Sequence, residues 1–144
     1  MLVSTKGRYA IRVLVDIAEN SNGSFVTLQE ISKRQEISKK YTEGIMSILV
    51  KNNLVDSSHG KGGGYRLNRS PEQYTILEII TLTEESLAPV SCLKKDAKIC
   101  PRFNICSTLS MWKEIYEIIT KYFKGKTIAD LMHKNLNDEN QKLI

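Results

Sequence analysis

Residues 60–64, with the sequence Gly-Lys-Gly-Gly-Gly, constrain the fold more than any other part of this chain. They lie between two short runs that are typical of strands, residues 54–58 and 65–67. Glycine tolerates the positive φ angles of a tight reversal, so the pattern predicts a two-stranded hairpin with a basic tip. The stretch is no Walker loop, because no Gly-Lys-Ser/Thr sequence opens a helix after it. A solvated hairpin tip without a ligand is the plain alternative.

Three helices are predicted before this hairpin. The first spans residues 4–20, where apolar side chains recur at helical spacing. Thr27 and Glu30 have the spacing of a capping box that opens a short second helix, and Ser38 caps a third. Two short helices joined by a turn are typical of a helix-turn-helix, although any pair of core helices can give the same pattern. The hairpin that follows favours a winged helix.

After the hairpin, the sequence predicts a helix over residues 75–85, a loop over residues 86–100 and then the longest helix. The long helix is expected to begin at Pro101 or Asn104 and to end at Phe123. It carries two adjacent apolar stripes, a face wider than one domain core needs, so a partner helix is expected. The first stripe comprises Ile105, Leu109, Trp112, Tyr116, Ile119 and Phe123, and the second comprises Met111, Ile115, Ile118 and Tyr122.

The predicted fold class is therefore mainly α with a small β-hairpin wing: a winged helix-turn-helix plus a long C-terminal dimerisation helix. We expect a DNA-binding domain over residues 1–75, a cysteine loop with dimerisation helices over 76–135 and a polar tail over 136–144. Residues 1–75 carry 11 Lys and Arg against 7 Asp and Glu, whereas residues 76–144 carry 10 against 9. This asymmetry suggests a polyanion partner for the first part, with a merely solvated surface as the alternative.

The location in the cell is predicted from two absences in the sequence. No apolar run approaches the roughly 20 residues that span a bilayer. Charged side chains such as Lys6 and Arg8 interrupt any apolar signal-peptide core. We therefore expect a cytoplasmic protein without a membrane partner.

The residues expected to contact DNA lie at the start of the third helix and at the hairpin tip. A helix that reads DNA places its first turn at the base edges, while its free N–H groups and basic side chains hold phosphates. Glu43 fits this surface if it accepts a hydrogen bond from a cytosine amino group; an exposed helix-forming residue is the alternative. The candidate DNA-binding residues are Ser38, Lys39, Lys40, Tyr41, Glu43, His59 and Lys61.

The three cysteines, Cys92, Cys100 and Cys106, all fall within 15 residues of the chain. Their C-x7-C-x5-C spacing is unlike that of a zinc finger or a bacterial ferredoxin. Three soft ligands on a loop that leads into a helix suit an iron–sulfur cluster, and Cys106 near the helix N-terminus is expected to favour the thiolate. Redox-active or structural thiols are the alternative. The two histidines show no metal-pair spacing, and no catalytic triad is recognisable, so we expect no enzyme.

Four segments of the chain form a recognisable set: Ser4–Ala10, Arg34–Ser38, Tyr41–Glu43 and Gly60–Tyr65. They resemble the Rrf-type winged-helix transcription regulators, in particular the IscR-, NsrR- and RirA-like members with a cysteine cluster. The resemblance covers about residues 1–135, and the N-terminal block together with the glycine-rich tip is highly specific. The cysteine spacing is closer to that of RirA than to that of IscR.

The resemblance implies a homodimer joined through its long helices on a near-palindromic double-stranded operator. It implies that Glu43 contacts a base, that the wing enters the minor groove and that the three cysteines hold a 2Fe-2S or 4Fe-4S cluster. Leu109 stands where IscR has a ligating histidine, and Arg8 stands where NsrR-like proteins can use an acidic ligand, so the fourth ligand is unknown. In the wing, His59 stands where relatives often have arginine.

Three hypotheses follow from the sequence. The first is a cytoplasmic regulator that senses iron–sulfur status, nitric oxide or redox stress through the cluster. The second is a clusterless regulator of cysteine or sulfur metabolism, gated by a protein partner or by thiol oxidation. The third is a thiol switch or zinc-binding interaction module without a DNA function, which the basic helix-turn-helix and wing argue against.

Overall fold

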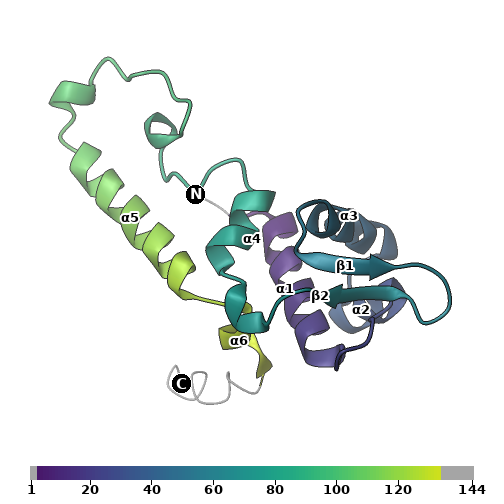
Figure 1. The fold of residues 1–144 in the computed structure, drawn as a ribbon. Coiled ribbons are helices and arrows are strands. Elements are labelled where there is room, and N and C mark those ends of the chain that lie inside the picture. Colours follow the sequence, from purple (N-terminus) through teal and green to yellow (C-terminus); the bar gives the residue numbers. More distant parts are fainter. Residues whose placement is uncertain (1–2, 134–144) are drawn as a thin grey trace.

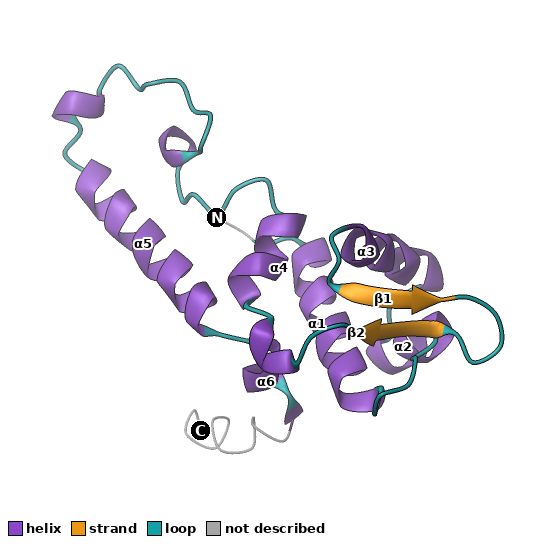
Figure 2. Ribbon diagram, viewed as in Figure 1, coloured by secondary structure: helices purple, strands orange, loops and turns teal. Residues whose placement is uncertain are grey.

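The computed structural model describes residues 3–133 and contains a compact winged head from which one long helix is set apart (Figures 1 and 2). The α-helices are α1 (Thr5–Asn20), α2 (Leu28–Gln35), α3 (Lys39–Lys51), α4 (Ile76–Thr83), α5 (Leu109–Gly125) and α6 (Ile128–Leu131). The strands are β1 (Val55–Ser58) and β2 (Gly64–Leu67), and short 3-10 helices are η1 (Pro71–Gln73), η2 (Ser91–Leu93) and η3 (Phe103–Ile105).

The three helices of the head begin at the capping residues that the sequence indicates. The Ser4 hydroxyl accepts a hydrogen bond from the Gly7 N–H at 3.1 Å and so caps α1. Thr27 and Glu30 form the full capping box of α2, and the Ser38 hydroxyl accepts from the Tyr41 N–H at the start of α3. Each side chain satisfies a backbone donor that has no partner inside its own helix. The predicted helix-turn-helix is confirmed.

The predicted hairpin is also present, and a third segment holds its base. Strands β1 and β2 pair antiparallel, from Val55 opposite Leu67 to Ser58 opposite Gly64. Val26, in the loop between α1 and α2, exchanges two backbone hydrogen bonds with Tyr65, each 2.8 Å long. These bonds tie the wing to the helix-turn-helix, and the tip projects from the side of the head away from α5 (Figure 1).

The core forms around α1, which packs against α2, α3, α4 and α6. Tyr74 lies at its edge and is fully buried, and its hydroxyl donates to the Leu54 carbonyl at 2.7 Å and accepts from the Asn68 and Arg69 N–H groups. A buried hydroxyl with several partners fixes the end of the wing against the root of α4. The largest fully buried apolar side chains are Leu14, Ile17, Ile31, Met46, Leu49, Leu54, Ile79, Ile80 and Ile128.

The long helix differs from the prediction at its start. Helix α5 begins at Leu109, not at Pro101 or Asn104, because residues 103–105 form the separate 3-10 helix η3 and Cys106 adopts an extended conformation. Ser and Thr at positions 107 and 108 are weak helix formers that favour helix ends, which explains the later start. Similarly, α4 ends at Thr83 and not at about Glu85.

The two apolar stripes of α5 occupy different environments. No residue of the helix is fully buried in this chain. Tyr116 and Phe123, from the first stripe, pack against the core of the head. The second stripe faces away and is exposed, with exposed fractions of 50% at Met111, 54% at Ile118 and 60% at Tyr122. Within residues 3–133 the head therefore covers part of the first stripe, while Ile105, which lies in η3 and not in α5, is 69% exposed and the second stripe is open.

Among residues 3–133 we find no helix with the length and apolar character that a membrane span requires. The polar tail that the sequence predicts at 136–144 lies outside the described residues.

Candidate nucleic-acid interface and cysteine loop

Helix α3 presents two opposite faces. Thr42, Ile45, Met46 and Leu49 are buried and hold the helix to the head. Lys40, Glu43, Gly44 and Ser47 follow the i, i+3, i+4, i+7 spacing of a single face, and all four are exposed. The predicted contact residues Lys40 and Glu43 therefore share one open surface.

The N-terminus of α3 has the features of an anion site. Ser38, Lys39 and Lys40 are exposed, and Tyr41 is 39% exposed. The Ser38 side chain uses only the Tyr41 N–H, so the N–H groups of the first turn before it have no partner within the helix. Free N–H groups at the positive end of the helix dipole, together with two lysines, favour a phosphate.

The structure adds Lys6, which sequence reasoning missed, to this surface. Lys6 lies on the first turn of α1, yet it lines the same hollow as Lys40 and Tyr41. The ring of Tyr9, one turn further along α1, meets Tyr41 edge to face with the ring centres 5.7 Å apart. The sequence separates Lys6 and Lys40 by more than 30 residues, and only helix packing shows that they share one surface.

An ion pair between α1 and α2 holds the reading helix in place. Asp16 is 2% exposed, and its carboxylate accepts hydrogen bonds from Arg34 at 2.7 and 2.9 Å and from the Gln35 amide at 2.9 Å. These bonds raise the pKa of Arg34, which stays charged. A buried carboxylate with three donors makes a stiff joint between the two helices, and α3 packs on both.

The remaining predicted DNA-contact residues, His59 and Lys61, are exposed at the wing. Below them, the Arg66 guanidinium lies over the Phe25 ring at 4.6 Å and pairs with Asp56 at 3.6 Å. The base of the wing is bonded to Val26, in the loop before α2, and is thereby joined to the helix-turn-helix.

The cysteine loop runs from the end of α4 to the start of α5. Cys92 lies in η2, Cys100 precedes η3 and Cys106 follows it; all three are free thiols of intermediate burial. Among residues 3–133, no three His, Cys, Asp or Glu side chains are close enough to form a metal site. The conformation described here therefore does not bring the three candidate ligands together.

Cys106 differs from the other two thiols in its surroundings. Its Sγ lies 3.4 Å from the Thr108 hydroxyl. Hydrogen bonds from that hydroxyl, and then from the backbone N–H groups of Thr108 and Leu109, lower the pKa of the Cys106 thiol. The shift has the direction expected from the sequence, but hydrogen bonds from Thr108 and Leu109 cause it, and the helix itself begins three residues after the cysteine.

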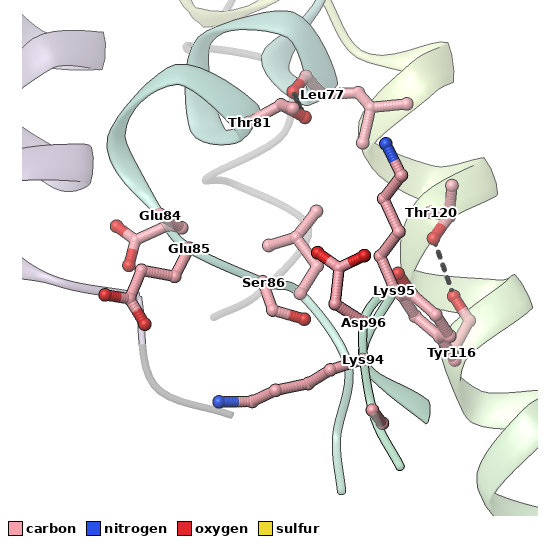
Figure 3. Close-up of a pocket in the computed structure, with 12 residues that line it drawn as sticks. Leu77, Thr81, Glu84, Glu85, Ser86, Lys94, Lys95, Asp96, Tyr116 and Thr120 are labelled. Carbon is pink, nitrogen blue, oxygen red and sulfur yellow. Dashed lines mark hydrogen bonds between the residues drawn. The ribbon is translucent and has the colours of Figure 1, made fainter. Parts of the chain in front are cut away.

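A cleft of about 520 Å³ separates the cysteine loop from the helices (Figure 3). Tyr116 and Thr120 of α5 form one wall, and Glu84 and Glu85 lie on the opposite side. Glu84, the first residue after α4, also reaches α1: its Oε1 accepts from the Ser4 hydroxyl at 2.6 Å and from the Ser4 N–H at 3.1 Å. The root of the cysteine loop is thereby joined to the N-terminus of α1.

Three helices and a paired hairpin with a basic, exposed reading face define a winged-helix protein of the DNA-binding class. Residues 3–134 match the Rrf2 family, described as an iron-dependent transcriptional regulator. The chain belongs to this family of transcriptional regulators. The expectation that it is not an enzyme is confirmed, because its relatives are named as transcriptional regulators.

Individual relatives agree with this assignment. The HTH-type transcriptional regulator IscR of Yersinia pseudotuberculosis (serotype O:1b, strain IP 31758) is 36% identical over 133 residues, which are 92% of this chain and 80% of that protein. IscR of Klebsiella pneumoniae (strain 342) is 35% identical over 133 residues, which are again 92% of this chain and 80% of that protein.

Two solved structures share the fold. CymR, the global cysteine regulator of B. subtilis, superposes with a TM-score of 0.74 at 28% identity and covers 91% of this chain and 95% of its own. IscR of T. potens superposes with a TM-score of 0.71 at 30% identity and covers 100% of this chain and 92% of its own.

Proposed function

We propose that this protein is a homodimeric, sequence-specific DNA-binding regulator whose cysteine loop senses iron–sulfur status, nitric oxide or redox stress through an iron–sulfur cluster. The observation that carries the proposal is the placement of three free thiols in one loop, between the reading head and the exposed face of α5. In this division, residues 1–75 bind the operator and residues 76–135 sense and dimerise.

The head supplies the DNA contacts. Lys39 and Lys40, with the free N–H groups of the first turn of α3, hold phosphates, while Glu43 accepts from a base. Ser38 and Tyr41 complete this end of the helix. His59 and Lys61, at the tip of the wing, contact the neighbouring groove of the DNA. A near-palindromic operator matches two such heads, with half-sites about one helical turn apart.

The second stripe of α5 supplies the dimer interface. Its exposed side chains form a continuous apolar row along the helix, the pattern of a helix that packs on a copy of itself. The expected partner is a second copy of the chain, because a regulator with one reading head per chain needs two heads to recognise a near-palindrome.

The donor chemistry of the loop fits an iron–sulfur cluster, since thiolates are the ligands that such clusters use. Cys92, Cys100 and Cys106 would hold it after the loop closes, because the described conformation keeps them apart. The cluster would supply reactivity toward oxygen or nitric oxide. The chain contributes a thiol of lowered pKa at Cys106, and a loop root tied to α1 by Glu84. No fourth ligand is assigned. Leu109 replaces the histidine that ligates in IscR, and Arg8 replaces the acidic residue that NsrR-like proteins can use.

The test is iron and sulfide analysis of anaerobically purified protein beside the Cys100→Ser variant, with Ser107→Ala as a control on the same loop. We expect iron and sulfide in the wild type and the control, and neither in Cys100→Ser, which stays a folded dimer because the core lies elsewhere. Zinc at one per chain, or equal iron in all three proteins, would defeat the cluster hypothesis.

A second candidate is a clusterless regulator of cysteine or sulfur metabolism, gated by a protein partner or by thiol oxidation. The separated thiols and the similarity to CymR favour it. Under this hypothesis, DNA binding is indifferent to iron and survives replacement of all three cysteines by serine. The wild type and a variant with Cys92, Cys100 and Cys106 all replaced by serine, assayed for DNA binding with and without iron, separate the two candidates.

A further inference from the structure

Gly44 occupies a position that the fold does not explain. It lies in the middle of α3, and glycine is the poorest helix former after proline. Its φ is not positive, and a Cβ atom built there would meet nothing within 4 Å. Neither backbone geometry nor a close neighbour in this chain therefore requires glycine. Glycine makes the helix less stable than alanine would at this position, which lies on the exposed face of α3 next to Glu43.

Gly44 lines a hollow of about 420 Å³ beside that face. Tyr41, Ile45 and Ile48 give the hollow an apolar lining, and Lys6 and Lys40 also line it. The two lysines are exposed and come from the first turns of α1 and α3. The hollow thus combines an apolar lining with two cations that can hold phosphates.

We propose that this hollow receives the 5-methyl group of a thymine in the operator, and that Gly44 is a specificity-determining residue. The inference rests on the proposed DNA-binding function. A thymine methyl is the apolar group that the major groove exposes, and proteins recognise it by apolar contact. The phosphates beside that base are the anions that Lys6 and Lys40 can hold, so charge and polarity both match DNA.

The position of the hollow defines which base it contacts. Glu43 and Gly44 are neighbours on the exposed face, so the hollow lies next to the base that Glu43 contacts, on the side of Tyr41 and Ile48. We therefore expect the thymine within one or two base pairs of the cytosine.

The experiment uses a duplex that the full-length wild-type protein selects from a random library, with each thymine replaced in turn by deoxyuracil, which lacks only the methyl group. At one thymine per half-site we expect binding to weaken about fourfold, the factor that corresponds to one buried methyl group. Gly44→Leu, which places an apolar side chain where the methyl group is proposed to lie, should bind the thymine and uracil duplexes equally. Ser47→Ala, on the same face, should keep the fourfold ratio.

Stability supplies an independent measurement. Gly44→Ala should raise the melting temperature, because alanine is the better helix former and its Cβ meets open space, yet it should lower the thymine-to-uracil ratio. If every uracil duplex binds like its thymine parent while one sequence is still selected, the inference is wrong and the DNA-binding function stands. If no sequence is selected, the proposed function itself fails.

Discussion

On the exposed face of α3, the carboxylate of Glu43 lies one turn after Lys39 and Lys40. Near phosphates a carboxylate is repelled, so it weakens binding to DNA in general. It strengthens binding only where a base donates a hydrogen bond to it. Under the proposed function, this balance assigns discrimination between sequences to Glu43 and general affinity for DNA to the lysines around it.

Glu43→Ala should relax sequence preference more than it lowers affinity. The contact with the correct base is lost, worth about 1–3 kcal/mol of discrimination, while repulsion from every phosphate is relieved. Binding to the selected operator and to random duplex, measured side by side, gives both effects. Glu72→Ala, at an exposed carboxylate on η1, is the control and should change neither. Equal weakening on both duplexes would contradict a base-contacting role.

Lys6→Ala and Lys40→Ala should each weaken binding to all sequences and flatten the salt dependence. Each removes about one phosphate contact per head and so about two per dimer, and the slope of log K against log salt should fall by about 1.8 in magnitude. Titrations at several salt concentrations measure it, with Lys121→Ala on α5 as the matched control. A Lys6 variant with an unchanged slope would remove α1 from the interface.

Among the elements, helix α5 has two apolar stripes with different surroundings. The head covers part of the first stripe, at Tyr116 and Phe123, and leaves Ile118 and Tyr122 of the second stripe exposed. Substitutions on the two stripes should therefore have different effects. A change on the inner stripe disturbs the packing of α5 on the head, and a change on the outer stripe disturbs assembly.

Ile118→Asp should give a folded monomer that binds DNA poorly. Burying the aspartate carboxylate in a helix–helix contact is unfavourable, whereas the same carboxylate on an exposed surface has little effect on folding. Sedimentation measures the assembly, circular dichroism measures the fold, and Glu117→Gln on the adjacent exposed position is the control. A variant that remains dimeric would place the interface elsewhere on the molecule.

At the scale of the whole molecule, the cysteine loop and the reading head meet at the N-terminus of α1. Glu84 at the root of the loop bonds to Ser4, which caps α1, and Tyr9 further along α1 contacts Tyr41 of α3. Gly7 lies under this junction, where a Cβ atom would come within 2.5 Å of the Glu84 Oε1. These contacts connect the root of the loop, through α1, to the residues of α3 that we propose contact DNA.

Gly7→Ala should displace the Glu84 side chain and break its bonds to Ser4, which lowers the free energy of unfolding by about 1–3 kcal/mol. Glu84→Ala removes the same bonds, so the double variant should be little less stable than the worse single variant. Denaturant unfolding of the four proteins completes the cycle. Strictly additive losses would show that Gly7 and Glu84 act independently.

The fold of the head could be predicted because it depends on interactions between residues that are close in the sequence. Ser38, Thr27 and Glu30 satisfy backbone donors within their own turn, so their pattern predicts the starts of α2 and α3 without any knowledge of the rest of the chain. The two strand-like runs on either side of the glycine-rich stretch predict the wing in the same way. The two stripes of α5 were visible because a helical period depends only on sequence spacing.

Helix ends also depended on groups outside the local pattern. Thr75 starts α4 as its spacing with Glu78 indicates, because its hydroxyl accepts from the Glu78 N–H at 3.2 Å; the Glu78 carboxylate, however, pairs with Arg69 at 3.0 Å instead of returning to the Thr75 N–H. Helix α5 begins at Leu109 because η3 and the extended Cys106 come before it.

The sequence by itself determined the winged head, the wide apolar face of α5 and the clustering of three thiols, because each depends on neighbours a few residues apart. Only the tertiary structure decided that Lys6 joins Lys40 at one surface, that Glu84 ties the loop to α1 and that Gly44 opens onto empty space. It also decided that the three thiols stand apart. The physical reason is that these features arise where helices distant in sequence pack together, and no local period or capping rule encodes the distance between them.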